Sequence, residues 1–115
     1  MTLQLSIVAV TACVSGVAHT YMAAEKIEKM CTAKGMKIRV ETQGALGIEN
    51  KLSDDEIKSS NLAIIIADIN IEGMERFDNC NVIKISTRLF LQSPEKVMKA
   101  IEDISLFSKG VKIHL

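Results

Sequence analysis

Two apolar runs restrict the folds open to this chain of 115 residues. The first lies in a strand predicted over residues 3–11 and is continuously apolar from Ile7 to Val10, and the second reads LAIIIA. Apolar runs without polar alternation, rich in β-branched residues, are typical of strands buried on both faces in the middle of a parallel sheet. Parallel strands need crossover connections, so helices are expected between them.

The segment after the first strand has the pattern of an amphipathic helix. Ala23, Ile27, Met30 and Cys31 fall at i, i+4, i+7 and i+8, which predicts one buried stripe. Gly35 follows, where a left-handed residue is needed to end a helix.

The segment MKIRVET alternates between apolar and charged residues. The alternation predicts a strand with one wet face, at the edge of the sheet, with Met36, Ile38 and Val40 inward and Lys37, Arg39 and Glu41 outward. The glycine-containing QGALGIEN that follows is predicted to be a loop.

The second half of the chain repeats this alternation of elements. SDDE at 53–56 predicts a helix start, with Ser53 and Glu56 as a capping box. NVIKIS predicts a fourth strand, and the last helix places Val97, Ile101 and Ile104 on one face. We therefore expect a single α/β domain over residues 1–115, with a mostly parallel sheet and right-handed crossovers.

Composition narrows the function classes. The 14 basic and 14 acidic residues cancel, and aromatic residues make up only 3%, so no nucleic-acid surface is indicated. The three cysteines show no CxxC spacing, which favours reduced thiols in the cytoplasm. No targeting segment is recognised, and the longest apolar run is too short to insert in a bilayer, so a partner would have to bring the protein to a membrane.

Three segments converge on one rim of the predicted sheet. In open α/β sheets, ligands bind beyond the carboxyl ends of the strands. Cys13, the segment Thr42–Gln43–Gly44 and Asp68 each follow the end of a predicted strand. We expect these residues to lie near one another, with Gln43, Gly44 and Asp68 as a possible rim around Cys13.

The loop after Cys13 leads directly into the first helix and is suited to binding an anion. A helix amino terminus presents unpaired N–H groups and the positive end of the helix dipole. The same field favours a thiolate, so the loop could activate Cys13 and hold a phosphoryl group on it. The predicted phosphate-binding residues are Val14, Ser15, Gly16, Val17, Ala18, His19 and Thr20.

The residues alone leave several roles open. Cysteine is among the most buried residue types, so Cys13 is either a packing residue or a nucleophile. His19 is a phosphoryl ligand, an acid–base group or a solvent-facing residue, and Asp68 is a turn former or an electrostatic participant. No set of residues has metal-ligand spacing and no nucleotide-binding loop is found, so no metal or cofactor is expected.

A comparison with cysteine phosphatases separates hydrolysis from transfer. Those enzymes use C-x5-R, in which the arginine stabilises the transferring phosphoryl group. The corresponding position here is His19, and the loop has no arginine. A phosphocysteine in such a loop is expected to be held for a second protein and not hydrolysed.

Three stretches resemble one known family. The segment CVSGVAHTYMAAE at 13–25 is similar to the phosphocysteine loop of fructose-specific enzyme IIB of the bacterial sugar phosphotransferase system. VETQGALGIEN at 40–50 and ADINIEGMERF at 67–77 also match stretches of that family. Val14 and Ser15 depart from the proline and threonine of the family loop, whereas the nucleophile is kept.

The resemblance implies a fold and a function. The fold would be a single enzyme IIB domain, a four-stranded parallel sheet of order 2-1-3-4 flanked by helices in a Rossmann-like three-layer sandwich. Cys13 would accept a phosphoryl group from a phosphohistidine of enzyme IIA and pass it to fructose or a related sugar on the membrane enzyme IIC. The protein would be cytoplasmic and peripheral to the inner membrane through that partner. The alternatives are a cysteine-dependent phosphatase and a non-catalytic regulatory module.

Overall fold

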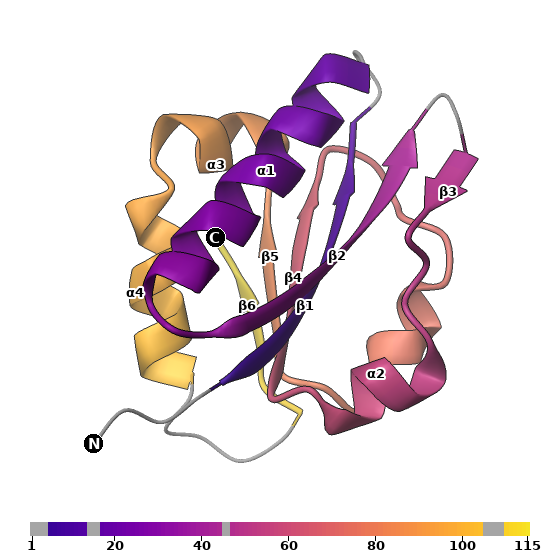
Figure 1. Cartoon of the computed structure of the whole chain (residues 1–115), viewed down its shortest axis with the longest axis vertical. Helices are drawn as coiled ribbons and strands as arrows, with labels where there is room; N and C mark the ends of the chain where they lie inside the picture. Colours follow the sequence, from indigo (N-terminus) through magenta and orange to yellow (C-terminus); the bar gives the residue numbers. More distant parts are fainter. Residues whose placement is uncertain (1–4, 14–16, 45–46, 105–109) are drawn as a thin grey trace.

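The chain folds around a six-stranded sheet of order β3-β2-β1-β4-β5-β6 (Figure 1). The structure, a computed structural model, describes residues 5–13, 17–44, 47–104 and 110–115. The strands are β1 (Ser6–Ala12), β2 (Lys37–Gly44), β3 (Gly47–Glu49), β4 (Leu62–Ala67), β5 (Val82–Ile85) and β6 (Lys112–His114). The helices are α1 (Val17–Ala33), α2 (Asp54–Ser59), the 3-10 helix η1 (Met74–Phe77), α3 (Thr87–Gln92) and α4 (Glu95–Ile104).

The four central strands are those predicted, in the predicted order. β2, β1, β4 and β5 are parallel neighbours, and β1 lies between β2 and β4. Their carboxyl ends point to the same rim, at the top of Figure 1, where α1 begins. The apolar runs of β1 and β4 are buried on both faces, as expected for central strands.

The prediction of a mostly parallel sheet is confirmed, but the number of four strands implied by the family resemblance is wrong. β3 adds an antiparallel strand beside Thr42–Gly44, within the segment predicted to be a loop, and β6 adds a parallel strand beside β5. Each of these strands has three residues, which is too short for an alternating pattern to appear. The carboxyl end of β2 is consequently paired with β1 on one side and with β3 on the other, and is not a free edge of the sheet.

Helices cover the two faces of the sheet unequally. α1, α3 and α4 lie on one face, whereas α2 lies on the other (Figure 1). On the first face, Ile7 and Ala9 of β1 belong to a core cluster with residues of these three helices: Ala23, Ile27, Cys31, Phe90, Val97, Ile101 and Ile104. On the second face, Val8 and Val10 pack with Ile57 of α2 and Phe77 of η1. The sheet therefore lies between two apolar layers.

The local signals for the helices are confirmed. Ala23, Ile27 and Cys31 of α1 are buried, and Gly35 follows the helix with φ of 76°. At α2, the Ser53 hydroxyl accepts the Glu56 N–H (3.1 Å), and the Glu56 carboxylate accepts the Ser53 N–H (3.0 Å). These are the two hydrogen bonds of a capping box.

The prediction from strand alternation is wrong for one side chain of β2, Glu41. Glu41 was predicted to face solvent with Lys37 and Arg39, but it is fully buried. The reason is Arg76 of η1, whose guanidinium reaches the Glu41 carboxylate and compensates the buried charge. Within the described residues, no helix is long and apolar enough to cross a membrane.

Candidate functional site

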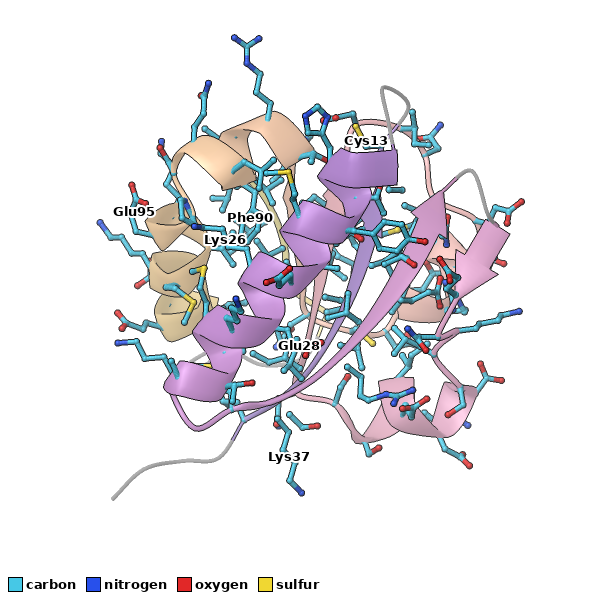
Figure 2. The ribbon with its side chains drawn as sticks, turned by 45° about the horizontal axis from the view of Figure 1, so that its top comes forward. Cys13, Lys26, Glu28, Lys37, Phe90 and Glu95 are labelled. Carbon is cyan, nitrogen blue, oxygen red and sulfur yellow. The ribbon has the colours of Figure 1, made fainter. Side chains whose placement is uncertain are left out.

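Cys13 lies at the carboxyl end of β1, close to the first turn of α1 (Figure 2). Its side chain is buried, with 9% of the residue exposed, but it lines a cavity. The thiol donates a hydrogen bond to Oδ2 of Asp68, with a distance of 3.2 Å between Sγ and the oxygen. A small residue at a strand end is thus placed as a group that a ligand can reach.

Asp68 connects three parts of the rim. It directly follows β4, and its N–H donates to the carbonyl of Ala12, the residue before the thiol (3.2 Å). Its second carboxylate oxygen, Oδ1, accepts the N–H of Thr87 at the start of α3 (3.0 Å). Because both oxygens and the backbone are engaged, the carboxylate is held in one orientation beside the sulfur.

A cavity of about 470 Å³ opens over the thiol. The thiol of Cys13 lines this cavity together with the ionisable side chains of His19 and Asp68. Residues of α3 complete the lining, among them Thr87, Arg88 and Leu91. The cavity is large enough for a phosphoryl group and part of the molecule that carries it. Its charged groups come from α1, from the end of β4 and from α3.

Arg88 is a site residue that the sequence reasoning missed. The loop after Cys13 has no arginine, but α3 brings an exposed one into the same cavity. α3 itself was not predicted, since it has only six residues. The available signal was Ser86, which directly follows β5. This serine caps α3, because its hydroxyl accepts the Leu89 N–H at 3.1 Å.

The predicted phosphate-binding residues are only partly described. Val14, Ser15 and Gly16 lie outside the described residues, and Val17 and Ala18 open α1. His19 is exposed in the first turn of α1 and lines the cavity. Thr20 is buried, and its Oγ1 has no hydrogen-bond partner in the described part of the chain. Buried hydroxyls are normally paired, so this hydroxyl, which has no partner among the described residues, needs an explanation.

Of the other predicted rim residues, Gln43 and Gly44 belong to the sheet. Gln43 is the neighbour of Ala12 in the register of β1 and β2, but its side chain exchanges hydrogen bonds with the backbone of Glu72 (2.8 and 3.0 Å). Gly44 pairs with Gly47 of β3. Asp68 is thus the predicted rim residue that contacts Cys13.

The other two cysteines are less suited to chemistry. Cys31 is fully buried on the inner face of α1, and burial raises the pKa of its thiol to about 11, so it is a poor nucleophile near neutral pH. Cys80 lies partly exposed before β5, where no function was assigned to it. Among the described residues, no group of His, Cys, Asp and Glu side chains is arranged to hold a metal ion.

A buried ion pair between Arg76 and Glu41 joins two segments that lead to the rim. Arg76 contacts both carboxylate oxygens of Glu41 (2.8 and 3.0 Å), and the Leu52 N–H donates to Oε1 (2.9 Å). The pair joins the two segments at 40–50 and 67–77, which are far apart in the sequence. The ion pair therefore holds the segment 67–77, which contains Asp68, against β2.

The comparisons with known proteins agree on one family and differ in the sugar that they name. Residues 8–100 match the family model described as PTS system, lactose/cellobiose-specific IIB subunit. The chain is 50% identical over 98 residues to the PTS system fructose-like EIIB component 3 of Escherichia coli K12, which covers 85% of this chain and 87% of the relative. A crystal structure of a predicted fructose-specific IIB from Escherichia coli superposes with a TM-score of 0.93 at 45% identity, covering 97% of this chain and 99% of the other. The fructose-specific EIIB'BC component of Vibrio cholerae is 43% identical over 105 residues, which are 90% of this chain and 18% of that longer protein.

Proposed function

Because the chain belongs to the enzyme IIB family of the sugar phosphotransferase system, as a fructose-like member and hence a phosphoryl carrier, we propose that Cys13 carries the phosphoryl group. The observation that supports this assignment most strongly is the position of the thiol. Cys13 lies at the carboxyl end of a central strand, between β1 and α1, at the base of an open cavity. Ligands of open α/β sheets bind at this place.

The proposed donor is a phosphohistidine of enzyme IIA, and the proposed acceptor is a sugar held by the membrane enzyme IIC. A relative from Vibrio cholerae carries B and C components in one chain according to its name, which supports a working partnership with enzyme IIC. The proposed sugar is fructose or a related one, as the names of the similar proteins suggest. Association with enzyme IIC would place this protein at the inner face of the membrane.

The residues around the thiol suit a phosphoryl group. The proposed cradle is the loop Val14–Gly16 with the first turn of α1, where N–H groups and the helix dipole favour an anion. The Thr20 hydroxyl, which has no partner among the described residues, is a candidate donor within it. Arg88 adds a guanidinium to the same cavity, and a charged donor of this kind binds phosphate oxygens strongly.

Loading of Cys13 tests the proposal. The protein is incubated with phosphorylated enzyme IIA, and the labelled residue is identified by mass spectrometry, with acid and base stability to distinguish thiophosphate from phosphohistidine. The Cys13→Ser variant should take up no label at this position. If it takes up as much label as the wild type, Cys13 is not the acceptor.

Alkylation gives an independent reading of the same site. At neutral pH, iodoacetamide should modify Cys13 before Cys31, because Cys31 is buried and its pKa is raised. Inorganic phosphate in the cavity should protect Cys13. A regulatory module without catalysis would instead bind its partner equally well after Cys13→Ala.

A further inference from the structure

The carboxylate of Asp68 is placed to receive a proton from the attacking sulfur. Its Oδ2 accepts the hydrogen bond of the Cys13 thiol at 3.2 Å, while its Oδ1 is held by the Thr87 N–H at 3.0 Å. A general base must lie within hydrogen-bond reach of the proton that it removes, and this geometry meets that condition already in the free protein.

We propose that Asp68 is the general base that removes the thiol proton of Cys13 during phosphoryl transfer, an inference that rests on the function proposed above. As Sγ attacks phosphorus, the S–P bond forms and the P–N bond of the donor's phosphohistidine breaks. The electron pair of the P–N bond stays on the imidazole nitrogen, and the thiol proton moves from Sγ to Oδ2 of Asp68. In the second transfer, a hydroxyl oxygen of the sugar attacks phosphorus, so that the O–P bond forms and the S–P bond breaks. The S–P electron pair stays on sulfur, Asp68 returns its proton to Sγ, and the hydroxyl proton of the sugar is released to water.

Charge balance favours this role over that of a permanent anion. An ionised carboxylate 3.2 Å from sulfur would repel both a thiolate and the phosphoryl group arriving on it. A carboxylate that takes up the thiol proton becomes neutral at the moment when the phosphoryl group arrives. The repulsion is thereby removed without movement of the side chain, which its contacts with Thr87 and Ala12 hold in place.

Other charged groups around Asp68 define the controls. His19 and Arg88 line the cavity that it shares with Cys13, and Lys84 and His114 line a second cavity on its other side. His19 is the alternative base because it lines the same cavity as the thiol. The side chains of Arg88 and Lys84 offer only hydrogen-bond donors, so neither is a candidate base.

The test is the effect of Asp68→Asn on two reactions of the same sulfur. The variant keeps an oxygen that can accept from Thr87 but loses the base. Single-turnover transfer from phosphorylated enzyme IIA should slow by about 100-fold near pH 7 and then rise with pH in proportion to the thiolate fraction. Alkylation of Cys13 by iodoacetamide, which needs only the thiolate, should be unchanged or faster. Asp68→Glu should recover part of the transfer rate.

A matched variant separates chemistry from structure. Asp103→Asn removes an exposed carboxylate of α4, away from the cavity, and should keep the wild-type pH profile of transfer. The proposal is overturned if Asp68→Asn transfers as fast as the wild type, if it slows transfer and alkylation equally, or if His19→Gln alone produces the change in pH profile. Failure of the underlying function would look different, because the wild type would then take up no phosphoryl group on Cys13.

Discussion

Arg76 and Glu41 form a two-point ion pair in which the carboxylate is fully buried and the arginine side chain is 13% exposed. The carboxylate also accepts the Leu52 N–H and the Gln43 amide. Arg76 lies in turn over the ring of Phe77, 5.1 Å from its centroid. This one pair therefore links β2, the segment before α2 and η1.

Breaking the pair on one side should destabilise the fold strongly. Arg76→Met leaves a buried carboxylate without its counter-charge, and we expect the free energy of unfolding to fall by about 3–5 kcal/mol. The double variant Glu41→Leu/Arg76→Met removes both charges and should be clearly more stable than the single one. Urea denaturation measures the free energy of unfolding of the single and the double variant. An equal decrease in the two variants would contradict this account of the ion pair.

The same carboxylate should make stability depend on pH. Burial alone would raise the pKa of Glu41, but the hydrogen bonds from Arg76, Leu52 and Gln43 and the charge of Arg76 hold it below its usual value. A carboxyl with a lowered folded-state pKa stabilises the fold above the pKa of the unfolded chain, about 4.3, and loses this contribution as pH falls through the folded-state value. Urea denaturation between about pH 6 and pH 3 should therefore show a falling stability whose slope is smaller in Glu41→Gln. An unchanged slope in that variant would contradict the assignment.

Thr20 offers a test of the phosphoryl cradle that does not disturb the fold. Its buried hydroxyl has no partner among the described residues, so replacement by the isosteric valine should leave the free energy of unfolding unchanged or raise it by about 1 kcal/mol. Phosphoryl uptake by Cys13 should become slower if the hydroxyl binds the phosphoryl group. A variant with wild-type uptake would exclude Thr20 from the cradle.

Arg88 should contribute charge without contributing to the core. Arg88→Gln removes an exposed guanidinium from the cavity, and we expect phosphoryl transfer to slow on the order of tenfold, as for loss of a hydrogen bond to a charged group. Thermal stability should be unaffected. Lys96→Gln on α4, also exposed, is the matched control and should transfer at the wild-type rate. Equal slowing in both variants would indicate a general effect of net charge.

The sequence predicts the parts of this protein that follow from periodicity and local capping. Buried runs identify β1 and β4, a stripe of apolar residues identifies α1, and Ser53 with Glu56 identifies the start of α2. The elements that were missed, β3, β6 and α3, are three to six residues long, and the two strands depend on pairing with other strands. Short elements carry little periodic signal of their own.

The residues of the site likewise fall into those that the sequence predicts and those that it does not. Cys13 and Asp68 could be predicted because strand ends in a parallel sheet meet at one rim. Arg88 could not, because its place depends on the missed α3. Glu41 was misplaced because strand alternation takes no account of Arg76, which lies 35 residues away along the chain.

The most direct test of the carrier function is the fate of the phosphoryl group after loading. Protein phosphorylated at Cys13 is isolated and mixed with membranes that contain the cognate enzyme IIC, with and without fructose, and phosphosugar and inorganic phosphate are both measured. A carrier predicts that the phosphoryl group leaves Cys13 only when sugar and enzyme IIC are present, with one phosphosugar formed for each group lost. Release of inorganic phosphate at the same rate without sugar would contradict the account and indicate a hydrolase.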